Sequence, residues 1–165
     1  MKFLRLLRHL FASRAGTRRR FPPEAMDAIE AAIKSVERRT SGEIRFAIET
    51  ALDIPELWAG KHPRERATEV FAQLNVWDSE LSNGVLIYVL VADRDVEIVA
   101  DRGAAARIGQ DGWQAACRLM EGHFRGGRFV EGSVAGVTAV GGLLERHFPA
   151  RAADRNELPN QPTLL

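Results

Sequence analysis

The sequence contains one cysteine, Cys117, and lacks any apolar run near the roughly 18–20 residues of a membrane-spanning helix. A single cysteine excludes an intramolecular disulfide and is typical of a reducing compartment, so we expect a cytoplasmic protein. The four histidines lack the HxxxH spacing of a zinc site. No glycine cluster follows a strand with the spacing of a phosphate-binding loop, and no serine has a paired histidine. These absences argue against a zinc site, a phosphate-binding loop and a serine–histidine triad.

Acidic residues are missing from the first twenty positions, which carry seven lysines and arginines. At helical spacing the apolar residues of this segment share one side: Phe3, Leu4, Leu6, Leu7, Leu10 and Phe11. Residues 1–14 are therefore predicted to form a basic amphipathic helix. Three roles remain open for it. The helix could dock on its own domain or on an unknown protein partner, or residues 2–12 could lie on an anionic membrane surface at the inner face of the membrane. Nucleic-acid binding is the least favoured, because no aromatic-rich basic surface follows, and we predict no nucleic-acid partner.

The rest of the chain divides at changes in composition. We predict a linker over residues 15–23, an α/β domain over 24–149 and a disordered tail over 150–165. The apolar spacing predicts helices over residues 24–39, 64–74, 110–124 and 130–147, and strands over 43–50, 85–91 and 95–100. Residues 104–109 read as a loop or weak turn.

The strand over 85–91 is apolar throughout, which is typical of a strand covered on both faces at the centre of a sheet. A strand, a helix and a second strand form a right-handed crossover, so the first two strands should be parallel. A two-residue link, Asp93-Arg94, would make the third strand antiparallel to the second by a hairpin. The predicted fold class is therefore α/β, a three-layer α/β/α sandwich on a small mixed sheet.

This topology sorts the polar side chains between the two ends of the sheet. One end gathers Glu43, Asp78, Glu80, Asn83 and Asp101. Oxygen ligands from a loop and a strand end are what Ca²⁺ or Mg²⁺ requires, so we predict a divalent-cation site there, with calcium preferred. The opposite end gathers Glu49, Asp53, Asp93 and Asp95 and is the less favoured place for such a site. The plain alternative is that these acids are solvated strand ends.

Four short motifs carry a resemblance to a known family: Ser41-Gly42, Asn83-Gly84-Val85-Leu86, Ala92-Asp93-Arg94 and Asp101-Arg102-Gly103. Together they resemble the TPM domain family over residues 24–148, and the chain looks like its short, stand-alone bacterial branch. That family takes its name from thylakoid-lumen and other membrane-associated members, some described as acid phosphatases in photosystem repair. Some members bind calcium, so the resemblance also implies a divalent-cation site.

The departures from the family pattern fall at motif positions. Ser82 stands where members usually have Asp, Ala92 replaces the first turn Asp, and the Gly-Tyr-Gly exit is Asp101-Arg102-Gly103. The first functional hypothesis is a cation-binding or quality-control module near a membrane. A metal-dependent acid phosphatase, with Arg102 steadying the phosphoryl charge, is the alternative. A metal-free protein-interaction domain is the third possibility.

Overall fold

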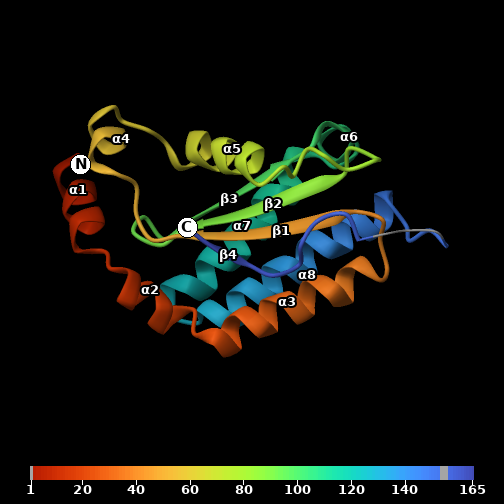
Figure 1. Cartoon of the computed structure of the whole chain (residues 1–165), viewed down its shortest axis with the longest axis horizontal. Coiled ribbons are helices and arrows are strands. Elements are labelled where there is room, and N and C mark those ends of the chain that lie inside the picture. The colour runs from red at the N-terminus through yellow and green to blue at the C-terminus, as the bar shows by residue number, and fades with distance from the viewer. Residues whose placement is uncertain (1, 153–155) are drawn as a thin grey trace.

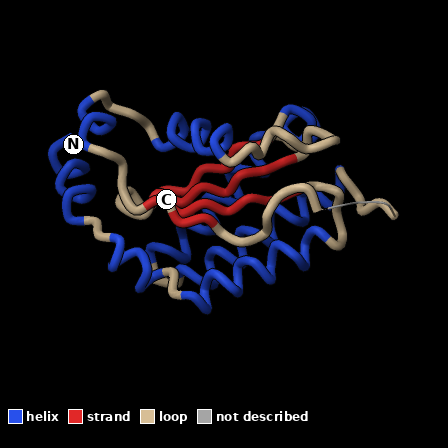
Figure 2. The backbone as a smooth tube through the Cα atoms, in the orientation of Figure 1, coloured by secondary structure: helices blue, strands red, loops and turns tan. Residues whose placement is uncertain are grey.

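Residues 2–152 and 156–165 are described by a computed structural model, in which helices flank a four-stranded sheet (Figure 1 and Figure 2). The helices are α1 (Lys2–Phe11), α2 (Arg14–Arg20), α3 (Pro23–Glu37), α4 (Ile54–Trp58), α5 (Pro63–Gln73), α6 (Arg102–Arg107), α7 (Gln110–Arg125) and α8 (Phe129–His147). The strands are β1 (Glu43–Glu49), β2 (Gly84–Leu90), β3 (Asp95–Ala100) and β4 (Thr163–Leu164).

The sheet has the strand order β3-β2-β1-β4. β1 pairs parallel with β2, and β2 pairs antiparallel with β3. The predicted α/β class, the parallel first pair and the hairpin are therefore confirmed. The hairpin turn is longer than the two-residue link that the sequence suggested, because β2 ends at Leu90 and β3 begins at Asp95. Arg94 occupies the left-handed region with φ 55°, which lets the turn close without Asn-Gly.

Alternate residues of the two central strands face different helices. Ile44, Phe46 and Ile48 of β1 pack in one cluster with residues of α3, α7 and α8. Ala47 packs on the other face, in a second cluster with residues of α5 such as Val70. Figure 1 shows α5 on one side of the sheet and α3, α7 and α8 on the other. All residues of β1 and β2 are buried because both faces are covered.

Two segments predicted to lack structure are helical. Most of the predicted linker, residues 15–23, lies in α2, and residues 104–109 fall largely in α6. A side chain caps each helix: Ser13 Oγ accepts the Gly16 N–H at 3.0 Å, and Asp101 Oδ1 accepts the Arg102 N–H at 2.7 Å. These caps satisfy backbone donors that a short helix otherwise leaves exposed.

The C-terminal segment corrects the prediction of a disordered tail over 150–165. Residues 153–155 lie outside the described residues, but 156–165 packs against the domain, where β4 pairs parallel with β1. The guanidinium of Arg45 donates to the backbone oxygens of Pro159 and Gln161 and, at 2.7 Å, to Thr163 Oγ1. Leu158 is buried in the same segment. Side chains of β1 thus fix a polar, proline-containing segment that has little tendency to order by itself.

Candidate functional site

The sheet brings three of the five predicted site residues to one end, as the topology required. Glu43 is in register with Gly84, which follows Asn83, and the Asp101 N–H donates to Gly84 O at 2.8 Å. Glu43, Asn83 and Asp101 are all buried. Buried polar side chains require hydrogen-bond partners, and these partners differ among the three residues.

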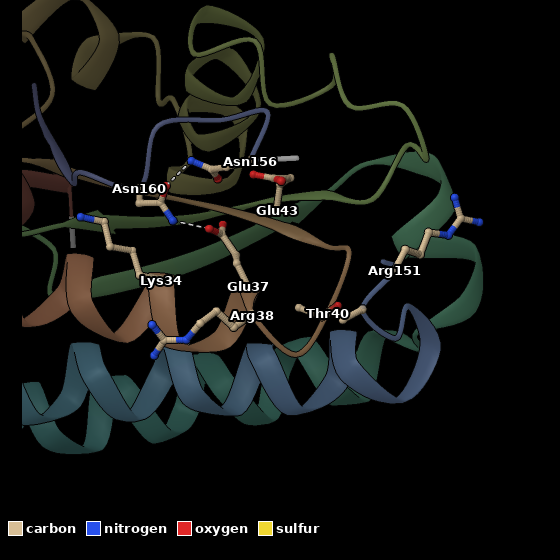
Figure 3. Close-up of a pocket in the computed structure, with 9 residues that line it drawn as sticks. Lys34, Glu37, Arg38, Thr40, Glu43, Arg151, Asn156 and Asn160 are labelled. Carbon is tan, nitrogen blue, oxygen red and sulfur yellow. Dashed lines mark hydrogen bonds between the residues drawn. The ribbon is translucent and has the colours of Figure 1, made fainter. Parts of the chain in front are cut away.

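Glu43 holds the C-terminal segment. Its two carboxylate oxygens accept the backbone N–H groups of Glu157 and Leu158, each at 3.2 Å. Glu43 also lines a pocket of about 470 Å³ between α3 and that segment, where Glu37 accepts from the side chain of Asn160 (Figure 3). Glu37 further accepts the Ile44 N–H at 3.0 Å. Both carboxylates in this pocket therefore serve to fasten the chain.

Asn83 organises the loop before β2. Its side-chain amide donates to Ser41 O at 2.6 Å, which ties this loop to the turn before β1. Ser79, which the sequence analysis missed, accepts the N–H groups of Asn83 and Gly84 at 3.1 and 3.2 Å. Its position four residues before Asn83 was the available signal, since serine hydroxyls commonly bond nearby backbone in loops.

Asp101 is a buried predicted ligand with one carboxylate oxygen that lacks a partner among the described residues. Its Oδ1 caps α6, whereas its buried Oδ2 has no hydrogen-bond partner within the described part of the chain. Asp78 and Glu80 are exposed on the preceding loop. Among residues 2–152 and 156–165, no group of three or more His, Cys, Asp or Glu side chains is arranged to hold a metal ion. The predicted set does not form a ready-made cation site.

The opposite end of the sheet is occupied by α1. Arg5 Nε donates to Asp93 Oδ2 at 2.9 Å, and His9 Nε2 lies 3.1 Å from Asp93 Oδ1. The Leu52 N–H donates to His9 Nδ1 at 3.0 Å, and Arg5 also donates to Lys61 O. Burial raises the pKa of the Asp93 carboxyl, but hydrogen bonds from His9 and Arg5 outweigh it, so this pKa lies below its usual range. Asp93 therefore anchors α1 to the domain.

Two of the other acids at this end, Glu49 and Asp53, also have local roles. Glu49 is bound by Arg66 and by the hydroxyl of Tyr88, and Asp53 precedes α4 as its N-cap. Asp95 is half-buried, and burial, followed by the nearby carboxylates, of which Glu97 contributes most, raises its pKa to about 6. Ion pairs and a helix cap within the chain therefore engage Asp93, Glu49 and Asp53, whereas the buried Oδ1 of Asp95 has no hydrogen-bond partner among the described residues.

The polar side of α1 faces the domain, and its apolar side faces outward. Successive helical residues are about 100° apart, so Arg5 and His9 share a side that is opposite the apolar stripe. Eight large apolar side chains are exposed among the described residues, and six of them lie on α1 and α4: Phe3, Leu4, Leu10, Phe11, Ile54 and Trp58. These six residues form what we call the apolar surface. Beside it, a groove of about 630 Å³ runs between α1 and α4.

Arg5 and His9, the two residues that orient α1, were not predicted as such from the sequence. The signal was present in the helical spacing, because Arg5 and His9 lie together away from the apolar stripe. The described residues contain no helix with the length and apolar content needed to cross a bilayer.

The model of one protein family, the TPM domain, matches residues 19–143. The chain belongs to the TPM domain family. This confirms the resemblance drawn from the sequence motifs, and the match begins inside α2 and ends inside α8. α1 and the C-terminal segment lie outside the matched part of this TPM domain. A search of curated proteins finds no significant match.

Two solved structures are similar to this TPM domain. The NMR structure of the BA42 protein from the psychrophilic bacterium Bizionia argentinensis has 34% sequence identity and a TM-score of 0.76, over 86% of this chain and 93% of that one. The N-terminal domain of a protein from P. gingivalis has 20% identity and a TM-score of 0.58, over 78% of this chain and 81% of that one. The second likeness concerns the fold alone.

Proposed function

We propose that this TPM domain works at the surface of an anionic membrane, on which it docks through α1 and α4. The observation that carries the proposal is the inverted attachment of α1. A surface helix of a globular protein normally turns its apolar stripe toward the core. Here Asp93 holds the polar side, and Phe3 and Phe11 remain 70% and 83% exposed. Exposed apolar residues on two helices that line a common groove are typical of a binding face.

Charge favours a lipid surface as the occupant. The first twenty residues carry seven basic side chains and no acid; Arg5 is paired with Asp93, whereas Arg8 and the four arginines of α2 add positive charge next to the apolar surface. Basic residues near an anionic bilayer add about 1 kcal/mol each to binding. Trp58, 75% exposed on α4, supplies the amphipathic ring that prefers the interface between headgroups and acyl chains. A chain with one cysteine is typical of a reducing compartment, so we propose that docking takes place at the inner face of the cytoplasmic membrane.

Vesicle binding tests this proposal. We expect the full chain to co-sediment with phosphatidylcholine vesicles containing phosphatidylserine, and less with phosphatidylcholine alone. A Phe3→Ser/Phe11→Ser protein is expected to bind at least about tenfold more weakly, because each buried phenylalanine contributes about 1.5–3 kcal/mol. The matched control is Trp77→Ser/Leu119→Ser, which removes the two exposed large apolar residues outside the apolar surface.

Two results would contradict membrane docking. Equal losses in both double variants would show that the position of the apolar residues is irrelevant. A wild-type protein that ignores both vesicles but dimerises through Phe3 and Phe11, measured by sedimentation velocity, would identify the occupant as a second copy of the chain.

A weak divalent-cation site at the far end of the sheet is a second candidate function. It rests on Asp101, since a buried carboxylate oxygen without a hydrogen bond is costly and a cation would relieve that cost. Asp78 and Glu80 are exposed on the nearby loop and would have to be ordered on binding. Glu43 and Asn83 already bind backbone and would supply structure to the site.

Calorimetric titration of Ca²⁺ into metal-stripped protein tests the second candidate. We expect a dissociation constant of about 10⁻⁴–10⁻³ M, as in calcium modules that bind weakly. Asp101→Asn is expected to abolish binding, and Asp53→Asn, at the other end of the sheet, to leave it unchanged. Loss of p-nitrophenyl phosphate turnover in the same Asp101→Asn protein would favour the phosphatase alternative. An absence of saturable binding by the wild-type chain would refute both and favour the interaction domain.

A further inference from the structure

Six exposed arginines lie on α2, which follows α1, and where α7 meets α8. Four come from α2 and two from the end of α7 and the turn that precedes α8: Arg14, Arg18, Arg19, Arg20, Arg125 and Arg128. We call these six residues the arginine surface. Its two parts are more than a hundred residues apart in the sequence, so no local motif predicts it.

Aromatic packing holds the two parts together. The ring of Phe21 meets Phe124 edge-on at 6.3 Å and Phe129 at 5.6 Å, between ring centroids. Phe124 and Phe129 stack at 5.1 Å, and the Arg20 guanidinium lies 5.6 Å above Phe129. Phe21 and Phe124 are buried in the main core. The arginine surface is therefore fixed by the folded domain and is present before any partner arrives.

The charge of this surface is not neutralised by ion pairs. Within residues 2–152 and 156–165, every ion pair involves other basic side chains. The nearest acids along the chain are Glu24 and Glu131, which are exposed, and Glu121, which is partly buried four residues before Arg125 on α7. Guanidinium groups gathered in this way repel one another, and an anionic partner removes the repulsion.

We propose that the arginine surface selects lipids whose headgroup carries a phosphate monoester; this inference rests on the proposed membrane docking. Arginine binds phosphate oxygens with two parallel hydrogen bonds, and a phosphate monoester offers three acceptor oxygens and nearly two negative charges to several guanidinium groups at once. Only Ala12 and Ser13 separate α1 from α2, so the arginine surface begins where the docking helix ends (Figure 1). The apolar surface would insert into the bilayer, and the arginine surface would bind the lipid headgroup.

The test compares vesicles of equal charge. Phosphatidylcholine vesicles containing phosphatidic acid are matched by zeta potential to vesicles containing phosphatidylserine. The full chain is expected to bind the first more tightly, and an Arg18→Gln/Arg19→Gln/Arg125→Gln protein to lose at least about tenfold on them. The control, Arg38→Gln/Arg118→Gln/Arg151→Gln, removes the same charge from three exposed arginines elsewhere. It is expected to keep the preference for phosphatidic acid.

A soluble probe separates this inference from membrane docking. Inositol hexakisphosphate titrated without vesicles is expected to bind the wild type and the control, and not the Arg18/Arg19/Arg125 triple variant. That result, with no vesicle binding, would refute docking and keep the arginine surface. The opposite result would be vesicle binding that depends on Phe3 and Phe11, equal affinity for both lipids and no binding of inositol hexakisphosphate. It would support membrane docking and refute the role of the arginine surface. Equal losses in the two triple variants, or tighter binding of single-stranded RNA through the same arginines, would overturn the headgroup proposal.

Discussion

The free energy of unfolding of a Glu49→Ala protein is expected to be about 3–5 kcal/mol lower than that of the wild type. Removing one partner of a buried ion pair leaves the charge of the other uncompensated. Glu49 Oε2 lies 2.9 Å from Arg66 Nε, and Oε1 lies 2.9 Å from Arg66 Nη2. The hydroxyl of Tyr88, a fully buried residue, also donates to Glu49. Burial first, and then the Glu49 carboxylate, raise the pKa of Tyr88, so this tyrosine stays protonated.

Urea unfolding followed by tryptophan fluorescence and circular dichroism measures the change. The matched control is Glu69→Ala, because Glu69 binds the same Arg66 at 3.1 Å but its side chain is 44% exposed. An exposed pair is worth about 0–1 kcal/mol, so the control should lose little. Losses of similar size in the two proteins would contradict the assignment of Glu49 as the buried anchor.

Two neighbouring glycines of α8 are expected to respond with opposite sign to the same substitution. A Cβ at Gly141 would lie 2.5 Å from both Cγ atoms of Val36 on α3, whereas at Gly142 it would meet nothing within 4 Å. Gly141→Ala overpacks the α3–α8 contact and should cost about 1–3 kcal/mol. Gly142→Ala adds helix propensity alone and should stabilise the protein by up to about 1 kcal/mol.

Thermal and urea unfolding of the two single variants measure this pair. Stabilisation by both substitutions would mean that α3 and α8 can move apart at no cost. The double variant, in which the effects should nearly add because only Gly141 touches α3, checks that the two changes are independent.

The central sheet could be predicted from the sequence because the pattern of apolar residues in each strand indicates which of its faces are buried. The apolar run over 85–91 and the alternation over 95–100 are local signals, and they predicted the strands, their pairing and the end at which Glu43, Asn83 and Asp101 meet. The hydrogen-bond partners of those side chains could not be predicted from the sequence. Glu43 is bound by backbone from residues 157 and 158, and nothing near position 43 indicates that contact.

The remaining errors share a physical cause. β4 has two residues and is held mainly by Arg45, more than a hundred positions away, so no periodicity could predict it. The inverted attachment of α1 likewise depends on Asp93, 88 residues after Arg5. By contrast, the helix α6 had a readable signal, an aspartate cap before three alanines, which the glycine at position 103 obscured.

The parallel pairing of β1 and β2 has a consequence for how the two ends of the molecule sense their surroundings. α1 and α4 lie at the carboxyl ends of these strands (Figure 1), and Asn83 and Asp101 lie beside Gly84 at the other end. Seven residues of strand separate them, about 23 Å at roughly 3.3 Å per residue. That is more than twice the Debye length of about 8 Å at physiological salt. We therefore expect the lipid composition beneath α1 to have little effect on the cation affinity proposed for Asp101.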